Sequence, residues 1–189
     1  GGIVFNGGGY PVTAGAFQTT FQGAGTLGVD IGITRFSPTG NARIFSTYLG
    51  GNQDEWPHSL FADPQGNLVV LGRTFSSNFP TLTNFGPGGG CDIIVTKINA
   101  AGTGLIGSIK IGGNGDDGAN IDATGSPTCS SLLYNYGDNA RSEVILDGSN
   151  NIILASCTQS PDFPVGPGIP IQQTNGGGSG TGRTGRRHR

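Results

Sequence analysis

Charged side chains, long apolar runs and methionine are all scarce or absent in this sequence of 189 residues. Charged residues make up 12%, the formal net charge is −2, and there is no methionine. Binding of nucleic acid needs a basic field that this composition lacks outside the arginines at the C-terminus, so we expect no nucleic-acid partner. The apolar runs are too short to cross a membrane, and no signal-like segment follows Gly1. We therefore expect no membrane insertion, and a processed or excised piece.

Cysteine is also sparse, with only Cys91, Cys129 and Cys157. Three is an odd number, so at most one internal disulfide can form and one thiol is left over. The spacings do not match the paired-cysteine pattern of a zinc site. Buried free thiols and a single bridge in a secreted protein both remain open.

Glycine, by contrast, is abundant, with 37 residues in the chain. Glycine in the middle of a helix costs about 1 kcal/mol relative to alanine, which argues against a helical fold. Short apolar runs between clusters of Gly, Asn, Asp and Pro are typical of many short strands joined by tight turns. The composition predicts an all-β fold without long helices.

An internal repeat organises the chain. The segment Phe45–Glu55 is a strand-like run that enters a Gly-Gly turn and ends in two acids, and Ser108–Asp117 repeats it 62 positions later. Asp30–Phe36 and Asp92–Ile98 are related by the same offset. Two blocks in one order at one spacing indicate a β repeat array.

A hairpin follows each block, but the second hairpin is delayed. The turn at Asp63–Asn67 has its counterpart at Asp147–Asn151, 84 positions on, so 22 residues are inserted within Gly118–Ala140. We expect Asp63 and Asp147 to accept hydrogen bonds from backbone amides two or three residues further on. The repeat region is predicted to span residues 1–174, and residues 175–189 a flexible Gly/Arg-rich tail or linker.

These blocks resemble the bacterial β-propeller repeat often called the SBBP repeat. The similarity is carried by Pro11–Thr20, by Phe45–Gly51 and by Asp63–Gly72. The insert, Ile109–Ile111 and Pro57-His58 depart from the pattern of that repeat. The resemblance implies a secreted or surface-displayed bacterial protein, as in many gliding Bacteroidetes-type organisms, with a scaffold or adhesive role and no catalytic residues.

The resemblance implies blades that are four-stranded antiparallel meanders. We count nine strands, a little over two blades, whereas propellers close with 4–8 blades. The chain is therefore expected to be part of a larger propeller, or to be completed by partners. In such a meander the long connections at 75–91 and 112–141 share one end of the blade. Loops on a rigid scaffold commonly carry binding, so we assign binding to this end.

Four acids that follow the Gly-Gly turns are candidate Ca²⁺ ligands, because Ca²⁺ prefers clustered carboxylates. They are Asp54, Glu55, Asp116 and Asp117. No Asp-x-Asp-x-Asp-Gly series accompanies them, so capping of the turns is the favoured explanation.

Trp56, beside the first Gly-Gly turn, and four aromatic and apolar side chains of the insert are the candidate binding residues. They are Trp56, Leu132, Leu133, Tyr134 and Tyr136. Their rings could stack on sugars, although Trp56 could also wedge between blades. Catalysis by His58 is disfavoured, because no nucleophile motif accompanies it. The Cys129–Cys157 pair is the favoured bridge, since both residues belong to the insert and the hairpin it precedes.

We expect a non-catalytic extracellular adhesion module that uses no cofactor and binds other protein subunits or surface components. The alternative is a carbohydrate-binding or accessory propeller domain of a polysaccharide-acting enzyme. Binding to glycans through Trp56 or Tyr134 would favour that alternative. Regular self-assembly, or attachment to a surface complex, would favour the adhesion module.

Overall fold

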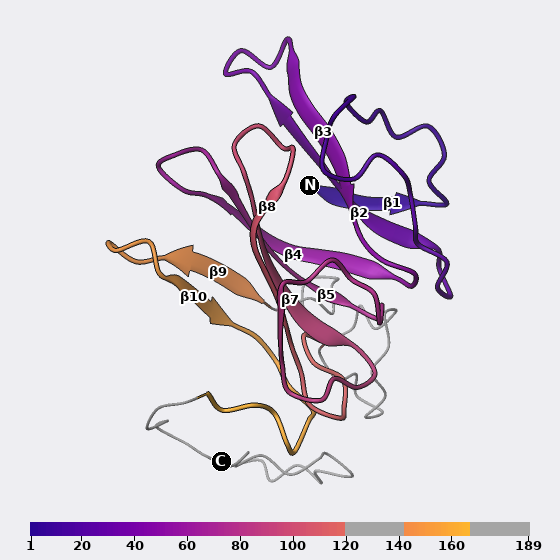
Figure 1. Ribbon diagram of the computed structural model, residues 1–189, viewed down its shortest axis with the longest axis vertical. Coiled ribbons are helices and arrows are strands. Elements are labelled where there is room, and N and C mark those ends of the chain that lie inside the picture. The colour runs from indigo at the N-terminus through magenta and orange to yellow at the C-terminus, as the bar shows by residue number, and fades with distance from the viewer. Residues whose placement is uncertain (120–141, 167–189) are drawn as a thin grey trace, which may run out of the picture.

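The computed structural model describes residues 1–119 and 142–166, and within these ranges the protein is all-β (Figure 1). These residues contain no helix, and hence no helix that could cross a membrane. The strands are β1 (Gly2–Phe5), β2 (Val29–Phe36), β3 (Arg43–Leu49), β4 (Glu55–Ala62), β5 (Leu68–Thr74), β6 (Thr83–Phe85), β7 (Asp92–Ile98), β8 (Leu105–Ile111), β9 (Glu143–Leu146) and β10 (Ile152–Ala155).

The strands form three sheets. The first sheet has the order β1-β2-β3, the middle sheet β4-β5-β7-β8-β6, and the last sheet β10-β9. All neighbours from β4 to β8 in the middle sheet pair antiparallel, which confirms the predicted four-stranded meander. The turns at 63–67 and 99–104 therefore lie at one end, which we call the hairpin end. The connections at 75–91 and after Ile111 start from the other end, which we call the loop end.

One strand was not expected from the sequence. The connection between β5 and β7 was predicted to be an irregular loop, but its residues Thr83–Phe85 form β6, which pairs parallel with β8. The three residues are all exposed and follow a proline closely, so no apolar alternation marks them as a strand. They cover the outer edge of the meander, which would otherwise present unpaired backbone groups.

A continuous apolar core joins the first sheet to the middle sheet. Side chains alternate along a strand, so every second residue of β2 and of β7 points into this core. Phe79, from the connection after β5, also packs here. The buried strand residues of this core are Ile31, Ile33, Phe45 and Leu49 from the first sheet and Val70, Ile94 and Ile98 from the middle sheet.

The opposite side of the middle sheet packs on the last sheet in the same manner. Burial of each such aliphatic side chain contributes about 1.5–3 kcal/mol, so this second core stabilises the protein substantially. Phe163 packs against it. Its buried members are Val69, Leu71, Ile93 and Val95 from the middle sheet and Val144 from the last sheet.

The two junctions are related by the repeat. We call the side of a sheet that points toward the next sheet its forward face, and the other side its backward face. Ile31 and Ile33 of the first sheet correspond to Ile93 and Val95 of the middle sheet, 62 positions on, and both pairs lie on forward faces. Each junction thus joins a forward face to a backward face, so the sheets stack head to tail.

The two predicted hairpin turns are equivalent in detail. The Asp63 carboxylate accepts hydrogen bonds from the backbone and side-chain amides of Asn67, and Asp147 does the same with Asn151. Asp147 also accepts from the amide of Ser149. The expected backbone bond two residues on is present at Asp147, whereas the Asp63 carboxylate bonds to a backbone amide four residues on and not two or three. The backbone of the same segment also closes a tight turn, in which the amide of Gly66 donates to the carbonyl of Asp63.

Candidate functional site at the loop end of the sheets

Two Gly-Gly turns lie at the loop end. The first turn covers residues 50–55, between β3 and β4, and the second turn covers residues 112–117, after β8. Both bring carboxylates into the protein interior: Asp54, Glu55 and Asp117 are buried. A buried carboxylate is costly unless it accepts hydrogen bonds, so the partners of each acid decide what the turn can do.

In the first turn, Glu55 fastens the connection after β5. Its Oε2 accepts from the amide of Gly51 at 3.0 Å, and its Oε1 accepts from the hydroxyl of Thr74 at 2.6 Å. The hydroxyl of Ser76 donates to the same Oε1. Ser76 Oγ in turn accepts from the amide of Gln53 at 2.7 Å. Glu55 therefore ties its own turn to the start of the connection after β5.

The second turn repeats this arrangement with an aspartate. The Asp117 Oδ2 accepts from the amide of Gly113 and from the hydroxyl of Ser160, both at 2.8 Å. The Ser160 hydroxyl accepts from the amide of Gly115 at 2.9 Å, as Ser76 does from Gln53. Asp117 and Thr158 also form an isolated antiparallel bridge. Equivalent bonds thus join the second turn to Ser160, which follows the insertion in the sequence.

The other acid of each turn anchors the start of the strand that pairs with the strand before the turn. Asp54 accepts from the amides of Leu27 and Val29, just before and at the start of β2. Asp116 accepts from the amide of Cys91, just before β7. The sequence-based interpretation of turn capping was correct in kind, but these two carboxylates cap segments about 25 residues away rather than their own turns.

A further aspartate faces each turn and was not among the predicted site residues. Asp30 lies beside Glu55, and a Cβ added to Gly50 would collide with both carboxylates. Asp92 stands in the same relation to Asp117 around Gly112. Both aspartates fall in the repeated block, so their recurrence at one offset was the available signal. The glycines are required here because no side chain fits between the paired acids.

The carboxyl pair in the first turn is protonated more readily than ordinary acids. Burial raises the pKa of Glu55 to about 7, against the hydrogen bonds from Ser76, Thr74 and Gly51, and the neighbouring Asp30 raises it further. Burial also raises the pKa of Asp30. The pair can therefore hold a proton near neutral pH, which keeps two like charges from meeting in the interior.

The four predicted Ca²⁺ candidates are divided between two turns, and each has protein donors. Within residues 1–119 and 142–166 no three His, Cys, Asp or Glu side chains gather into a set that could hold a metal ion. The arrangement acts as a scaffold in which carboxylates hold loops in place.

Trp56 and His58, at the start of β4, are engaged inside the protein. The Arg73 guanidinium carbon lies 5.5 Å from the centre of the Trp56 ring, within the range of a cation–π contact. Burial lowers the pKa of His58 to about 3, and the charge of Arg73 lowers it further. His58 is thus a neutral, half-buried ring whose two nitrogens are buried. Arg73, which sequence reasoning did not single out, links both residues.

Cys91 is a buried thiol whose sulfur donates to the carbonyl of Asp117 at 3.3 Å. Burial raises its pKa to about 12, and the charge of Asp116 adds to this effect. The remaining site predictions, Leu132, Leu133, Tyr134 and Tyr136, lie outside the described residues. Cys129 does too, so its bridge to Cys157 stays a prediction.

Exposed polar groups surround both turns at the surface. The amide of Asn52 donates to the side chain of Asn78 at 2.7 Å, and the amide of Asn114 donates to Asp162 at 2.9 Å. Each bond joins a Gly-Gly turn to the connection that follows the next hairpin. The loop end therefore presents a preorganised surface of backbone and carboxamide groups. No protein-family model and no curated protein matches the chain.

Proposed function

We propose that this chain is a non-catalytic structural and adhesive module of a secreted or cell-surface bacterial protein, built from β-propeller blades. The observation that carries the proposal is the repeated head-to-tail packing of the sheets, with equivalent hydrogen bonds at both Gly-Gly turns. Such packing adds units along a line or around an axis, which suits a scaffold.

In this interpretation the meander β4-β5-β7-β8 is one complete blade. The first sheet supplies three strands of the blade before it, and the last sheet supplies two strands of the blade after it. Apart from the added β6, the described residues form nine strands, the number expected from the sequence. The resemblance to the SBBP repeat supports a propeller, since four-stranded meanders stacked face to face are its unit.

Binding is assigned to the loop end. The turns there are held by buried carboxylates, so the exposed groups around Asn52, Asn78, Asn114 and Asp162 are fixed before a partner arrives. Preorganisation reduces the entropy lost on binding. The predicted binding residues Leu132, Leu133, Tyr134 and Tyr136 belong to the insertion that begins from the same end. Other protein subunits or surface components are the proposed partners.

The alternative, a carbohydrate-binding or accessory domain, depends on aromatic rings that are open to sugar. Trp56 is half-buried, its indole nitrogen is buried and its ring faces Arg73. This engagement favours a packing role for Trp56 and ranks the carbohydrate function second.

Two variants test the proposal on immobilised outer-surface material of a gliding bacterium, with binding followed by a biosensor. Deletion of residues 124–135 is expected to reduce binding, whereas replacement of the hairpin-end turn at 38–41 by a two-residue turn leaves it unchanged. Equal binding by both variants and the parent would refute the assignment to the loop end. A glycan array is the second measurement: glycan binding that is lost in Trp56→Ala would establish the alternative instead.

A further inference from the structure

Each junction in the protein joins a forward face to a backward face, and one face of each kind is left partly uncovered by the described residues. The backward face of the first sheet is buried at Asp30, Ser46 and Tyr48 but open at β1, and the forward face of the last sheet is open at Ile145 and Ile153. Val69, the counterpart of Ile153 in the second junction, is buried, whereas Phe61, the counterpart of Ile145, is 40% exposed. The protein thus has one open area on a forward face and one on a backward face, the two kinds of face that its own junctions join.

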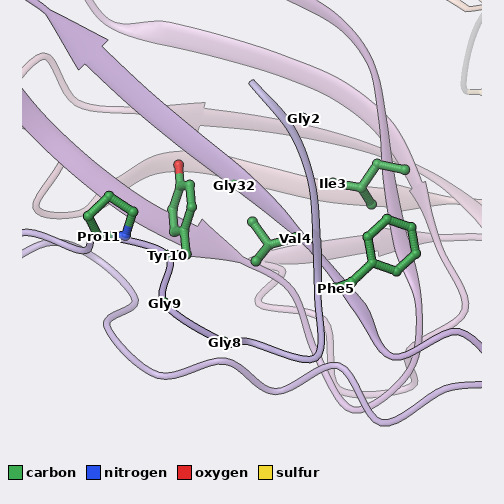
Figure 2. A pocket seen from close by; sticks show the side chains of 9 residues that line it. All are labelled: Gly2, Ile3, Val4, Phe5, Gly8, Gly9, Tyr10, Pro11 and Gly32. Atoms are coloured by element: carbon green, nitrogen blue, oxygen red, sulfur yellow. The ribbon is translucent and has the colours of Figure 1, made fainter.

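The backward face of the first sheet contains a hollow of about 400 Å³ (Figure 2). Gly2 lies opposite Gly32, and Val4 and Tyr10 flank the hollow on the same side of β1. Gly32 occupies the position that Ile94 holds in the middle sheet, 62 residues on. Gly32 itself is buried beneath Val4 and Tyr10, so the hollow is open beside Gly2, where an added Cβ would meet no atom within 4 Å.

Tyr10 belongs to an aromatic-proline pair that recurs at every junction. Phe79-Pro80 and Phe163-Pro164 are its counterparts, and Phe79 and Phe163 pack into the first and second junctions. Tyr10 is placed beside the uncovered hollow in the same way. The first sheet thus already contributes the aromatic side chain that a third junction of this type needs.

The forward face of the last sheet carries two exposed isoleucines. Ile145 and Ile153 are paired directly across β9 and β10, and they are 55% and 49% exposed. Val144 and Leu154, the neighbouring pair, point the other way into the second core. Exposed β-branched side chains that lie opposite one another form an apolar patch suited to a protein contact.

We propose that the chain binds a second copy of itself head to tail, with the Ile145–Ile153 patch of one copy on the Gly2–Gly32 hollow of the next. The proposal extends the proposed function by naming one partner, and it rests on the head-to-tail packing rather than on adhesion. The occupant is a second copy because this chain supplies the two face types that its own junctions join. Such a contact is heterologous, so it builds rings when it closes and filaments when it does not.

The first measurement is the mass of the whole chain in solution, by light scattering and sedimentation over a range of concentrations. We expect species heavier than the 19.2 kDa of one copy, with a share that grows with concentration. A protein that stays at the mass of one copy up to its solubility limit would overturn the proposal, and would point to a different chain or segment as the occupant.

Blocked variants then test the direction of the contact. Ile145→Asp with Ile153→Asp blocks the forward face, and Gly2→Asp blocks the hollow, where a Cβ at Gly2 has no atom within 4 Å. Each blocked variant alone is expected to lose the heavier species. An equimolar mixture of the two is expected to regain a complex of two copies and nothing larger, because only one intact junction can form.

Other results of the mixing experiment would contradict the proposal. If the hollow-blocked variant still forms a dimer by itself, the isoleucine patches bind each other and the contact is not head to tail. If the mixture stays monomeric, the two faces do not meet. Ile106→Asp and Gly107→Asp are the matched controls on β8, since Ile106 is 51% exposed and Gly107 has open space, and both should assemble like the parent. Circular dichroism confirms that each variant is folded, and binding to surface material is scored separately, so loss of assembly and loss of adhesion are distinguishable.

Discussion

Lys110 Nζ lies 3.0 Å from Asp92 Oδ2, whereas the position of Lys110 in the preceding repeat is held by Tyr48, close to Asp30. The nearby charge of Asp30 and burial both raise the pKa of Tyr48. The second turn thus has a cation next to its carboxyl pair, and the first turn has a phenol. The first pair can meet its excess charge with a proton instead, because the pKa of Glu55 is raised to about 7.

The free energy of unfolding is expected to rise as the pH falls from about 7 toward 4.5. The pKa of Glu55 is raised to about 7 in the folded protein from 4.5, so between these values the folded state binds more protons than the unfolded state. Stability therefore falls as the pH rises through this window. The shift sets an upper limit on the order of 3 kcal/mol. Urea unfolding at pH 5 and pH 7.5 measures the difference.

Glu55→Gln is expected to flatten this pH dependence, because the group that takes up the proton is gone. Asp117→Asn is the matched change in the second turn, and it should leave the slope in place. A wild-type protein that is more stable at pH 7.5 than at pH 5 would show that Glu55 is not the controlling group.

The two hairpin aspartates are expected to differ in their sensitivity to neutralisation. Lys97 lies 2.7 Å from Asp63 and lowers the pKa of Asp63 to about 2, together with bonds from Asn67. Asp147 has its pKa lowered by hydrogen bonds from Asn151 and Ser149 instead. At pH 7 Asp63→Asn should therefore lower the urea midpoint more than Asp147→Asn. The difference between the two urea midpoints should narrow as the pH falls through about 2, where Asp63 itself becomes protonated. A difference that does not change with pH would show that the larger effect at Asp63 comes from packing.

Cys91 is expected to resist alkylation in the folded protein. A pKa of about 12 leaves roughly one thiol in 10⁴ ionised at pH 8, and the side chain is buried. Iodoacetamide treatment followed by peptide mass spectrometry measures its modification. The urea-unfolded protein, in which Cys91 should react completely, is the control. Rapid modification of Cys91 under native conditions would contradict the buried position.

Gly72→Ala is expected to destabilise the protein by about 1–3 kcal/mol or more, because the added Cβ would collide with the backbone carbonyl of Trp56. This close approach accompanies the register shift between Pro57 and Ser59. Gly107→Ala, in β8 of the same sheet, meets no neighbour and should be neutral or slightly stabilising. Thermal unfolding of both variants measures the contrast, and equal melting temperatures would disprove the close approach.

Most of the strands and turns that could be predicted from the sequence were found through its internal repeat. The offset of 62 residues located β2, β3, β7 and β8, and the turns at Asp63 and Asp147 located the hairpins, because Asp, Pro, Gly and Asn have local backbone preferences. Left-handed backbone at Gly66 recurs at Asn150, the equivalent position, which only Gly and Asn adopt readily. Local chemistry of this kind is visible in a single sequence.

The partners of the buried acids were not predictable in the same way. Asp54 bonds to amides of Leu27 and Val29, and Glu55 to hydroxyls of Thr74 and Ser76, and these contacts exist only after the sheets have formed. The sequence showed clustered carboxylates and favoured capped turns over a cation site, but it could not show which groups each carboxylate contacts. Those contacts depend on the tertiary structure, as does the contact between Arg73 and Trp56.

The hydroxyl of Ser160 donates to Asp117 and the amide of Gly118 donates to the carbonyl of Cys157, and these two bonds have a consequence for engineering. They join the segments on either side of residues 120–141 directly. A foreign peptide or small domain spliced into this position should leave the sheets folded. We therefore expect this position to accept an inserted sequence, because Ser76 donates to Glu55 in the same way in the first repeat, which has no insertion there.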